Sequence, residues 1–235
     1  MKTTRSLLVF LAMMLGPLAS ADMISELTAR AEAGEVAAQI ELAGILVKGE
    51  GVAKDPAAAT RWLVKAAETG GAPTQLIVGR KLITGDGAPK DVAEGVKWLQ
   101  AAAEAGNGEA QLALGGIFIG GKGVPKSSGE AAKWYQLAAK NGDPVAQTQL
   151  ARMHMTGAGV PKDDVEAYKW ADLAAMQEDA TAKKVVAFLS ARMTPGEIGE
   201  GRARAKEFVE ASATEAAGVP VPEPPLEPLP PVEPE

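Results

Sequence analysis

Apolar residues recur along most of this chain at the spacing of amphipathic helices, in short segments separated by glycine. Between residues 36 and 48, for example, Ala38, Leu42 and Leu46 follow one another at intervals of four, with Ile45 beside them. This spacing places the apolar side chains on one face of a helix. Runs of β-branched residues, which favour strands, do not stand out in the 235-residue sequence. The pattern therefore predicts pairs of short helices and an all-α fold.

The helical segments recur with a period of 36 residues, and all four tryptophans follow it, at Trp62, Trp98, Trp134 and Trp170. One glutamine and two connector glycines per unit share this period, in the columns Gln39, Gln75, Gln111 and Gln147; Gly49, Gly85, Gly121 and Gly157; and Gly51, Gly87, Gly123 and Gly159. So many columns in register indicate an internal repeat. Since one helical hairpin cannot bury its apolar face alone, the repeat predicts a stack of hairpins, an α-solenoid.

Each unit carries start and stop signals for two helices. We expect the Gly49 column to end the first helix in a left-handed conformation, and the Gly51 column to let the connector turn. The second helix is expected to follow an N-cap residue, at Asp55, Asp91, Ser127 and Asp163. Three residues later, three of the four units have a glutamate, which predicts a reciprocal capping box.

These columns resemble a known family. The patterns A-Q-x-x-L-[GA], G-x-G-V-x-K-D and A-x-x-W-x-x-x-A-A-x-x-G run from about Ala31 to Asp179 and are similar to those of the Sel1-like repeats, relatives of the tetratricopeptide solenoids. The resemblance implies a right-handed α/α superhelix that serves as an adaptor in protein complexes. It also implies that there are no catalytic residues to carry over, since most family members have none.

The N-terminal residues have the pattern of a secretory signal peptide. A short basic segment and an apolar stretch at residues 6–15 precede the cleavage motif Ala19-Ser20-Ala21. The stretch is shorter than the roughly 20 residues that a membrane span needs. We expect cleavage near Ala21, a mature chain without a transmembrane span, and a periplasmic or secreted location. Loss of Lys2 and Arg5 with this segment would take the formal net charge from −6 to −8.

The rest of the chain is expected to divide around the repeats. The division is a signal peptide at 1–21, an N-terminal capping helix at 22–34, four repeats at 35–178, a partial fifth repeat with a C-terminal capping helix at 179–211, and a disordered tail at 212–235. Residues 194–197 (Thr-Pro-Gly-Glu) have the capping-box pattern and mark the start of the last helix, which should run to about Val209. Proline fills 8 of the last 18 positions, so the tail is either a solvated segment or a ligand for a proline-recognising groove.

Composition excludes several kinds of chemistry. The chain has no cysteine and one histidine, which rules out thiolate zinc sites, cysteine nucleophiles and sites built from several histidines. The histidine, His154, shares its repeat column with Leu46, Leu82 and Phe118, so we expect it at an inward position and not in catalysis. A formal net charge of −6 disfavours nucleic-acid binding. We therefore expect no enzyme, cofactor, metal or nucleic-acid partner.

The positions that vary between the units are those that the scaffold does not need. On the first helix of each unit, the face at 37, 41, 44 and 48 varies most, and it predicts a partner-binding surface with Glu41, Ile77, Arg80, Gln149 and Arg152. Arg80 and Arg152 share a column with Gly116 between them, which suits an acidic segment or a C-terminal carboxylate of a protein or peptide. The alternatives are that these are plain solvent positions, or that each arginine pairs with a neighbouring carboxylate.

The function predicted from these features is an exported, tetratricopeptide-like scaffold that mediates protein–protein interactions in the periplasm, at the cell envelope. The alternatives are an exported hydrolase that acts on cell-wall material and a secreted factor that engages host proteins. The inventory of reactive groups disfavours the hydrolase, because the chain lacks cysteine and has a single histidine. The sequence does not separate the secreted factor from the periplasmic scaffold.

Overall fold

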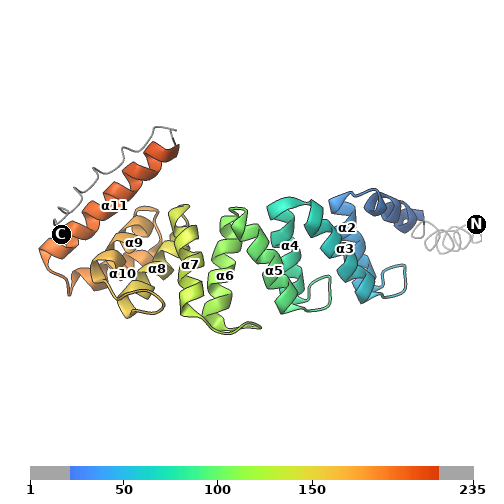
Figure 1. Cartoon of the computed structure of the whole chain (residues 1–235), viewed down its shortest axis with the longest axis horizontal. Helices are drawn as coiled ribbons and strands as arrows, with labels where there is room; N and C mark the ends of the chain where they lie inside the picture. Colours follow the sequence, from blue (N-terminus) through green and yellow to red (C-terminus); the bar gives the residue numbers. More distant parts are fainter. Residues whose placement is uncertain (1–21, 217–235) are drawn as a thin grey trace, which may run out of the picture.

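The computed structural model describes residues 22–216, which form α-helices joined by short connectors (Figure 1). Residues 22–32 form the first helix described. The helices that follow are α2 (Val36–Lys48), α3 (Pro56–Thr69), α4 (Gly71–Thr84), α5 (Val92–Glu104), α6 (Gly108–Gly120), α7 (Ser128–Lys140), α8 (Pro144–Thr156), α9 (Asp164–Met176), α10 (Ala180–Ser190) and α11 (Pro195–Ala216). No strand occurs between residues 22 and 216, and the predicted all-α fold is confirmed. The expected signal peptide and nearly all of the expected tail lie outside the described residues.

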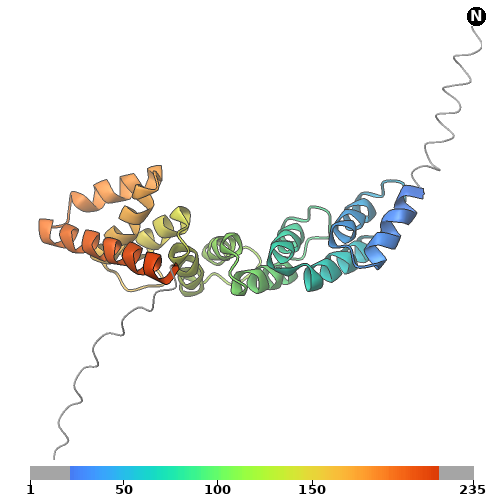
Figure 2. The ribbon, with the colours of Figure 1, turned by 90° about the horizontal axis from the view of Figure 1, so that it is seen from above.

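The helices pair into hairpins that stand side by side in one row (Figure 1). Seen from above, the row follows a shallow arc (Figure 2). The first helices of the hairpins, α2, α4, α6 and α8, lie toward the inner side of this arc together with α10, and we call these five the inner helices. The arrangement is the predicted solenoid.

Glycines at the ends of α2, α4, α6 and α8 let the connectors turn. The backbone of Gly49, Gly85, Gly121 and Gly157 is left-handed, with φ between 62° and 81°, as predicted. The second glycine of each connector also has a positive φ. At Gly159 a side chain is excluded for a further reason, because a Cβ atom there would lie 2.2 Å from the carbonyl oxygen of Ser128.

The second helix of each hairpin begins at the predicted N-cap residue. The side chains of Asp55, Asp91, Ser127 and Asp163 each accept a hydrogen bond from the backbone N–H three residues later, at 2.8–3.2 Å. Each of these bonds satisfies one of the N–H groups that the first turn of a helix leaves without a partner.

The predicted reciprocal half of the capping box is wrong in these helices. The glutamates do not reach back to the N-cap backbone but accept a hydrogen bond from a lysine one turn later, at 2.6–2.9 Å, in the pairs Glu94–Lys97, Glu130–Lys133 and Glu166–Lys169. The reason is that the N-cap N–H is already used. The N–H of Asp91, for example, donates to the carbonyl oxygen of Leu82 at 2.8 Å, and the equivalent bond occurs in the other three hairpins. This backbone bond ties the two helices of a hairpin together.

The glutamine column forms buried hydrogen bonds between neighbouring hairpins. The Nε2 atoms of Gln39, Gln111 and Gln147 each donate to a backbone carbonyl oxygen eight residues earlier, at 3.0–3.2 Å. In the third and fourth units the glutamine side chain makes a second hydrogen bond, through its Oε1 atom. Asn141 donates to Oε1 of Gln111 at 3.1 Å, and Gln177 donates to Oε1 of Gln147 at 3.0 Å. These side chains therefore link three successive helices.

The first two units lack the second bond of this ladder. The residues that donate the second bond, Asn141 and Gln177, belong to one repeat column. The same column holds Thr69 in the first unit and Ala105 in the second. Neither residue carries an amide group, and the Oε1 atoms of Gln39 and Gln75 are buried without a hydrogen-bond partner. Buried oxygens without a partner lower stability, because the oxygen has lost its water and gained nothing in return.

The tryptophan column lies where one hairpin meets the previous one. Trp62 packs against the cluster around Leu27 and Ala31, and Trp98 packs against a cluster formed by the preceding hairpin, α2 and α3, and by α4 of its own hairpin. Trp170 is buried, with 2% of its surface exposed, whereas the other three tryptophans are half-buried. The column therefore fills the contacts between units.

The junction between α3 and α4 departs from the others. The column that supplies the N-cap residues Asn107, Asp143 and Asp179 holds Gly71 here, which is the first residue of α4. The N-cap residue of α4 is Gly70, so α4 has no side-chain cap. The left-handed glycine also shifts by one position, since φ is −87° at Gly70 and +67° at Gly71. Within the described residues, the Gln75 side chain makes no hydrogen bond to α3. This junction consequently has the fewest polar bonds between units.

The C-terminal end of the array is covered by α11, which packs on α9. Here the capping box is complete, because the N–H of Thr194 donates to Oε2 of Glu197 at 2.8 Å and the N–H of Glu197 donates to Oγ1 of Thr194 at 3.3 Å. Phe208 meets Trp170 edge to face, with ring centroids 5.3 Å apart. The helix continues to Ala216, beyond the expected end near Val209.

Candidate partner-binding surface

The five residues predicted to bind a partner lie on the inner helices but do not form one site. Glu41 is on α2, Ile77 and Arg80 are on α4, and Gln149 and Arg152 are on α8. Gln149 is half-buried, and the other four are exposed. Gln149 and Arg152 line the same hollow. Glu41 lines a separate hollow at the N-terminal end, beside the first helix.

Arg80 is engaged within the protein. Its Nη1 atom lies 2.6 Å from Oε1 of Glu109 on α6, the next inner helix. Both side chains are about half exposed, at 50% and 56%, so the pair contributes roughly 0–1 kcal/mol to stability. Of the two alternatives to partner binding that the sequence leaves open, pairing with a neighbouring carboxylate is therefore the one that applies to Arg80.

Arg152 has a different environment. Its guanidinium group forms no ion pair with any carboxylate in residues 22–216. It lines two hollows, one of about 190 Å³ between α6 and α8 and one of about 240 Å³ between α8 and α10. We call these two hollows, with Arg152 between them, the inner groove.

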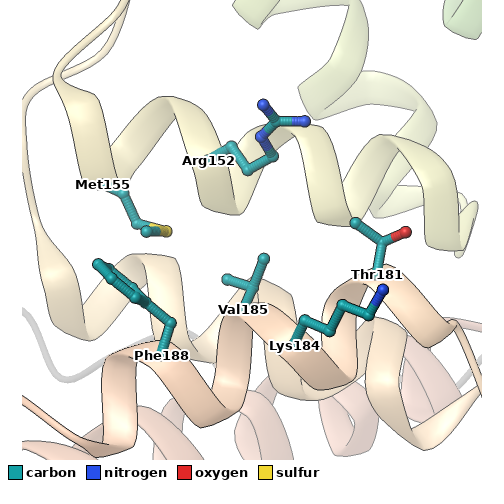
Figure 3. Close-up of a pocket in the computed structure, with 6 residues that line it drawn as sticks. All are labelled: Arg152, Met155, Thr181, Lys184, Val185 and Phe188. Carbon is teal, nitrogen blue, oxygen red and sulfur yellow. The ribbon is translucent and has the colours of Figure 1, made fainter.

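The hollow between α8 and α10 has a polar end and an apolar end (Figure 3). Met155 on α8 and Phe188 on α10 lie at one end, Thr181 and Lys184 lie at the other, and Val185 lies between them. Phe188 is 52% exposed although it is a large apolar residue. None of the residues that line this hollow is acidic.

The hollow between α6 and α8 has an apolar floor with a phenol group in it. Ile119 and Met153 line it with Tyr135, whose ring lies so close to Gly115 that a Cβ atom there would be 2.4 Å from Cε1. Burial raises the pKa of Tyr135, so its hydroxyl stays protonated at neutral pH and is able to donate a hydrogen bond. Only 6% of the Tyr135 surface is exposed.

Sequence analysis missed the part of the groove that α10 contributes, with Lys184, Val185 and Phe188. A signal was present, because Phe188 follows Arg152 by 36 residues and stands in the same column as Arg80. The predicted variable face covers only the four complete units, although α10 continues the row of inner helices. This column is otherwise filled by glycine and arginine, so the large apolar side chain of Phe188 was the signal for including α10 in the predicted surface.

A larger hollow, of about 530 Å³, is lined by residues from the end of α7 and from α8, α9 and α11. Its apolar lining includes Leu173, Met176 and Phe208. None of the five residues that the sequence predicts for partner binding lines it. Several of its walls, including Gln147 and Gln177, belong to the hydrogen-bond ladder that holds the hairpins together.

The remaining candidate for chemistry is His154, which is half-buried on α8. Its Nδ1 atom lies 3.1 Å from the carbonyl oxygen of Pro161. Since a carbonyl only accepts, Nδ1 carries the proton, and the ring fixes the connector after α8.

In the part of the chain described here, no three side chains of the metal-binding types gather into a possible metal site. No helix among residues 22–216 combines the length and the apolar character that a membrane crossing requires.

A row of two-helix units, joined by buried glutamines and tryptophans and open along its inner helices, defines an α-solenoid repeat protein. The pattern of the Sel1 repeat matches four segments of the chain, residues 36–70, 75–107, 108–143 and 144–179. The chain belongs to the Sel1 repeat family. Proteins of this family generally mediate protein–protein interactions and are typically scaffolds without catalytic activity.

Two crystal structures support the same assignment. One is c5321, a protective antigen present in uropathogenic Escherichia coli strains, which is 31% identical over 83% of this chain and 42% of its own, with a TM-score of 0.62. The other is a Sel1 repeat protein from Oxalobacter formigenes, which is 32% identical over 82% of this chain and 55% of its own, with a TM-score of 0.66. The chain thus spans about half the length of these relatives. No curated protein gives a significant match.

Proposed function

We propose that this protein is an exported scaffold that binds a partner protein in the inner groove and carries no enzymatic activity. The observation that carries the proposal is Arg152, an exposed guanidinium group without an ion pair in the described residues, between two hollows with apolar lining. The repeat does not require arginine here, since the same column holds glycine at Gly44 and Gly116. Residues that a scaffold does not need are available for recognition.

The chemistry of the groove suits a protein ligand. Arginine is enriched among the residues that dominate binding energy, because its planar group forms paired hydrogen bonds with carboxylates and stacks on apolar surfaces. Hollows of about 190 and 240 Å³ on either side of it are large enough to take single side chains of a partner. Gln149, the second predicted residue at this place, supplies an amide that can pair with a partner backbone.

The location and the division of the chain form the second part of the proposal. The pattern at residues 1–21 supports export and cleavage near Ala21, and with it a periplasmic or secreted scaffold. We divide the rest of the chain into a capping helix, four repeats, a partial fifth repeat with its capping helix, and the Pro/Glu-rich tail. N-terminal sequencing of the protein from its own cells tests export, with Asp22 as the expected first residue and Met1 on a cytoplasmic protein as the contradicting result.

Site-specific photo-crosslinking in the native cells tests partner binding. A photoreactive residue replaces Gln149, which lines the inner groove, and in a control it replaces Gln136, an exposed glutamine on α7. We expect one or more protein adducts from position 149 and none from position 136. Adducts from position 136 alone would show that the partner binds another surface.

A further inference from the structure

The hollow between α8 and α10 is polarised in a way that specifies its ligand. We infer that it takes an extended, acidic–apolar segment of a partner protein, in which a side-chain carboxylate pairs with Arg152 and Lys184 and a large apolar side chain packs between Met155 and Phe188. The inference rests on the proposed function and names the class of ligand for the same groove.

The polar end of the hollow is cationic and has no carboxylate of its own. Arg152 and Lys184 form no ion pair with the described residues. The neighbouring cations are already used, since Arg192 lies 3.2 Å from Asp164 and Lys183 is paired with Glu178. The two free cations belong to a chain with a formal net charge of −6. A positive site on a negatively charged protein selects anionic segments and disfavours cationic ones.

The apolar end of the hollow exposes side chains that an apolar side chain of the ligand would cover. Phe188 is 52% exposed, and Met155 and Val185 line the hollow beside it. The guanidinium group of Arg192 lies over the Phe188 ring at 5.4 Å from its centroid, within the range of a cation–π contact. A leucine-, methionine- or phenylalanine-sized side chain would cover these surfaces and exclude water from the neighbouring ion pair.

The carboxylate belongs to a side chain rather than to a chain terminus. Arg152 stands between two hollows, so a segment that fills one of them runs past the guanidinium group into the other. In the second hollow the segment meets Ile119 and the neutral hydroxyl of Tyr135, which suit a further apolar residue and a backbone carbonyl. A ligand that ended at Arg152 would leave one hollow empty.

Selection from a display library of random internal peptides on the immobilised full chain tests this inference. We expect enrichment of aspartate or glutamate within about three positions of a large apolar residue, a spacing set by the extended chain's rise of ~3.3 Å per residue. The double variant Arg152→Glu, Lys184→Glu is expected to bind the selected peptides at least tenfold more weakly and to enrich lysine or arginine in their place. Phe188→Ala is expected to keep the acidic preference and to lose the apolar one.

A matched control separates local from overall charge. Lys122→Glu, Lys126→Glu changes the net charge by the same amount in the connector after α6, and affinity for the selected peptides should stay within twofold. Equal weakening by the two double variants would overturn the inference, as would peptides without an acidic preference. In both cases adducts from position 149 would still uphold the proposed function. Retained thermal unfolding midpoints show that the variants are folded.

Discussion

At the level of single residues, the buried glutamines distinguish the four units from one another. Gln111 and Gln147 use both ends of the amide group, whereas the Oε1 atoms of Gln39 and Gln75 have no partner. The difference follows from one position per unit, which carries an amide in the third and fourth units only. Stability in a stacked repeat is a sum of contacts between neighbours, so these bonds strengthen the C-terminal half.

Exchanging the residue at this position should move stability in both directions. Asn141→Ala leaves Oε1 of Gln111 buried without a partner and should lower the free energy of unfolding by about 1–3 kcal/mol. Ala105→Asn supplies the missing donor near Gln75 on a backbone with nearly the same angles and should raise it by up to about 1 kcal/mol. Urea unfolding followed by circular dichroism measures both. A loss of stability in Ala105→Asn would show that the amide does not reach Gln75.

At the level of helices, the N-caps are held by one bond and not by a reciprocal pair. Asp91 accepts from the N–H of Glu94 at 3.0 Å, while the Glu94 side chain binds Lys97 on the surface. Asp91→Ala should therefore cost about 1 kcal/mol, whereas Glu94→Gln should change stability by less than about 0.5 kcal/mol. Chemical unfolding of the two variants decides the point. Equal losses would mean that the glutamate does complete a capping box.

The complete capping box of α11 makes the contribution of Glu197 to the stability of the folded state depend on pH. Hydrogen bonds from the backbone and side chain of Thr194 lower the pKa of Glu197 below its usual 4.5. A lowered pKa stabilises the folded state above pH 4.5, and the contribution disappears as the pH falls through the lowered value. Wild type should thus unfold at a higher temperature than Glu197→Gln at pH 7, and the two should converge in acid. A constant difference at every pH would contradict this role.

The helices and their caps could be read from the sequence because they depend on neighbours along the chain. Asp163 and Gly157 act through residues a few positions away, and local patterns predict such effects. The capping boxes failed because the N–H of Asp91 is bound by Leu82, across a connector whose fold the local pattern does not contain. The inner groove could not be predicted in this way, because Phe188 and Met155 come from different hairpins and meet only when the hairpins stack.

At the level of the whole molecule, the junction between α3 and α4 is the weakest contact in the row. It lacks a side-chain cap on α4 and a ladder bond from Gln75, whereas the far end is covered by α11. Repeat arrays open at their weakest interfaces. Amide hydrogen exchange should therefore be fastest, among helix interiors, in α2 to α4 and slowest in α8 and α9. Uniform exchange along the row would show a single cooperative unit.

The central claim is that a partner protein binds the inner groove through Arg152, and the affinity of Arg152→Ala for that partner tests it most directly. The partner is the protein recovered as an adduct from position 149, and calorimetry measures its dissociation constant. We expect Arg152→Ala to bind at least tenfold more weakly with an unchanged unfolding temperature, and Arg80→Ala, whose guanidinium group already pairs with Glu109, to bind within about threefold of wild type. Unchanged affinity in a folded Arg152→Ala variant would contradict the account.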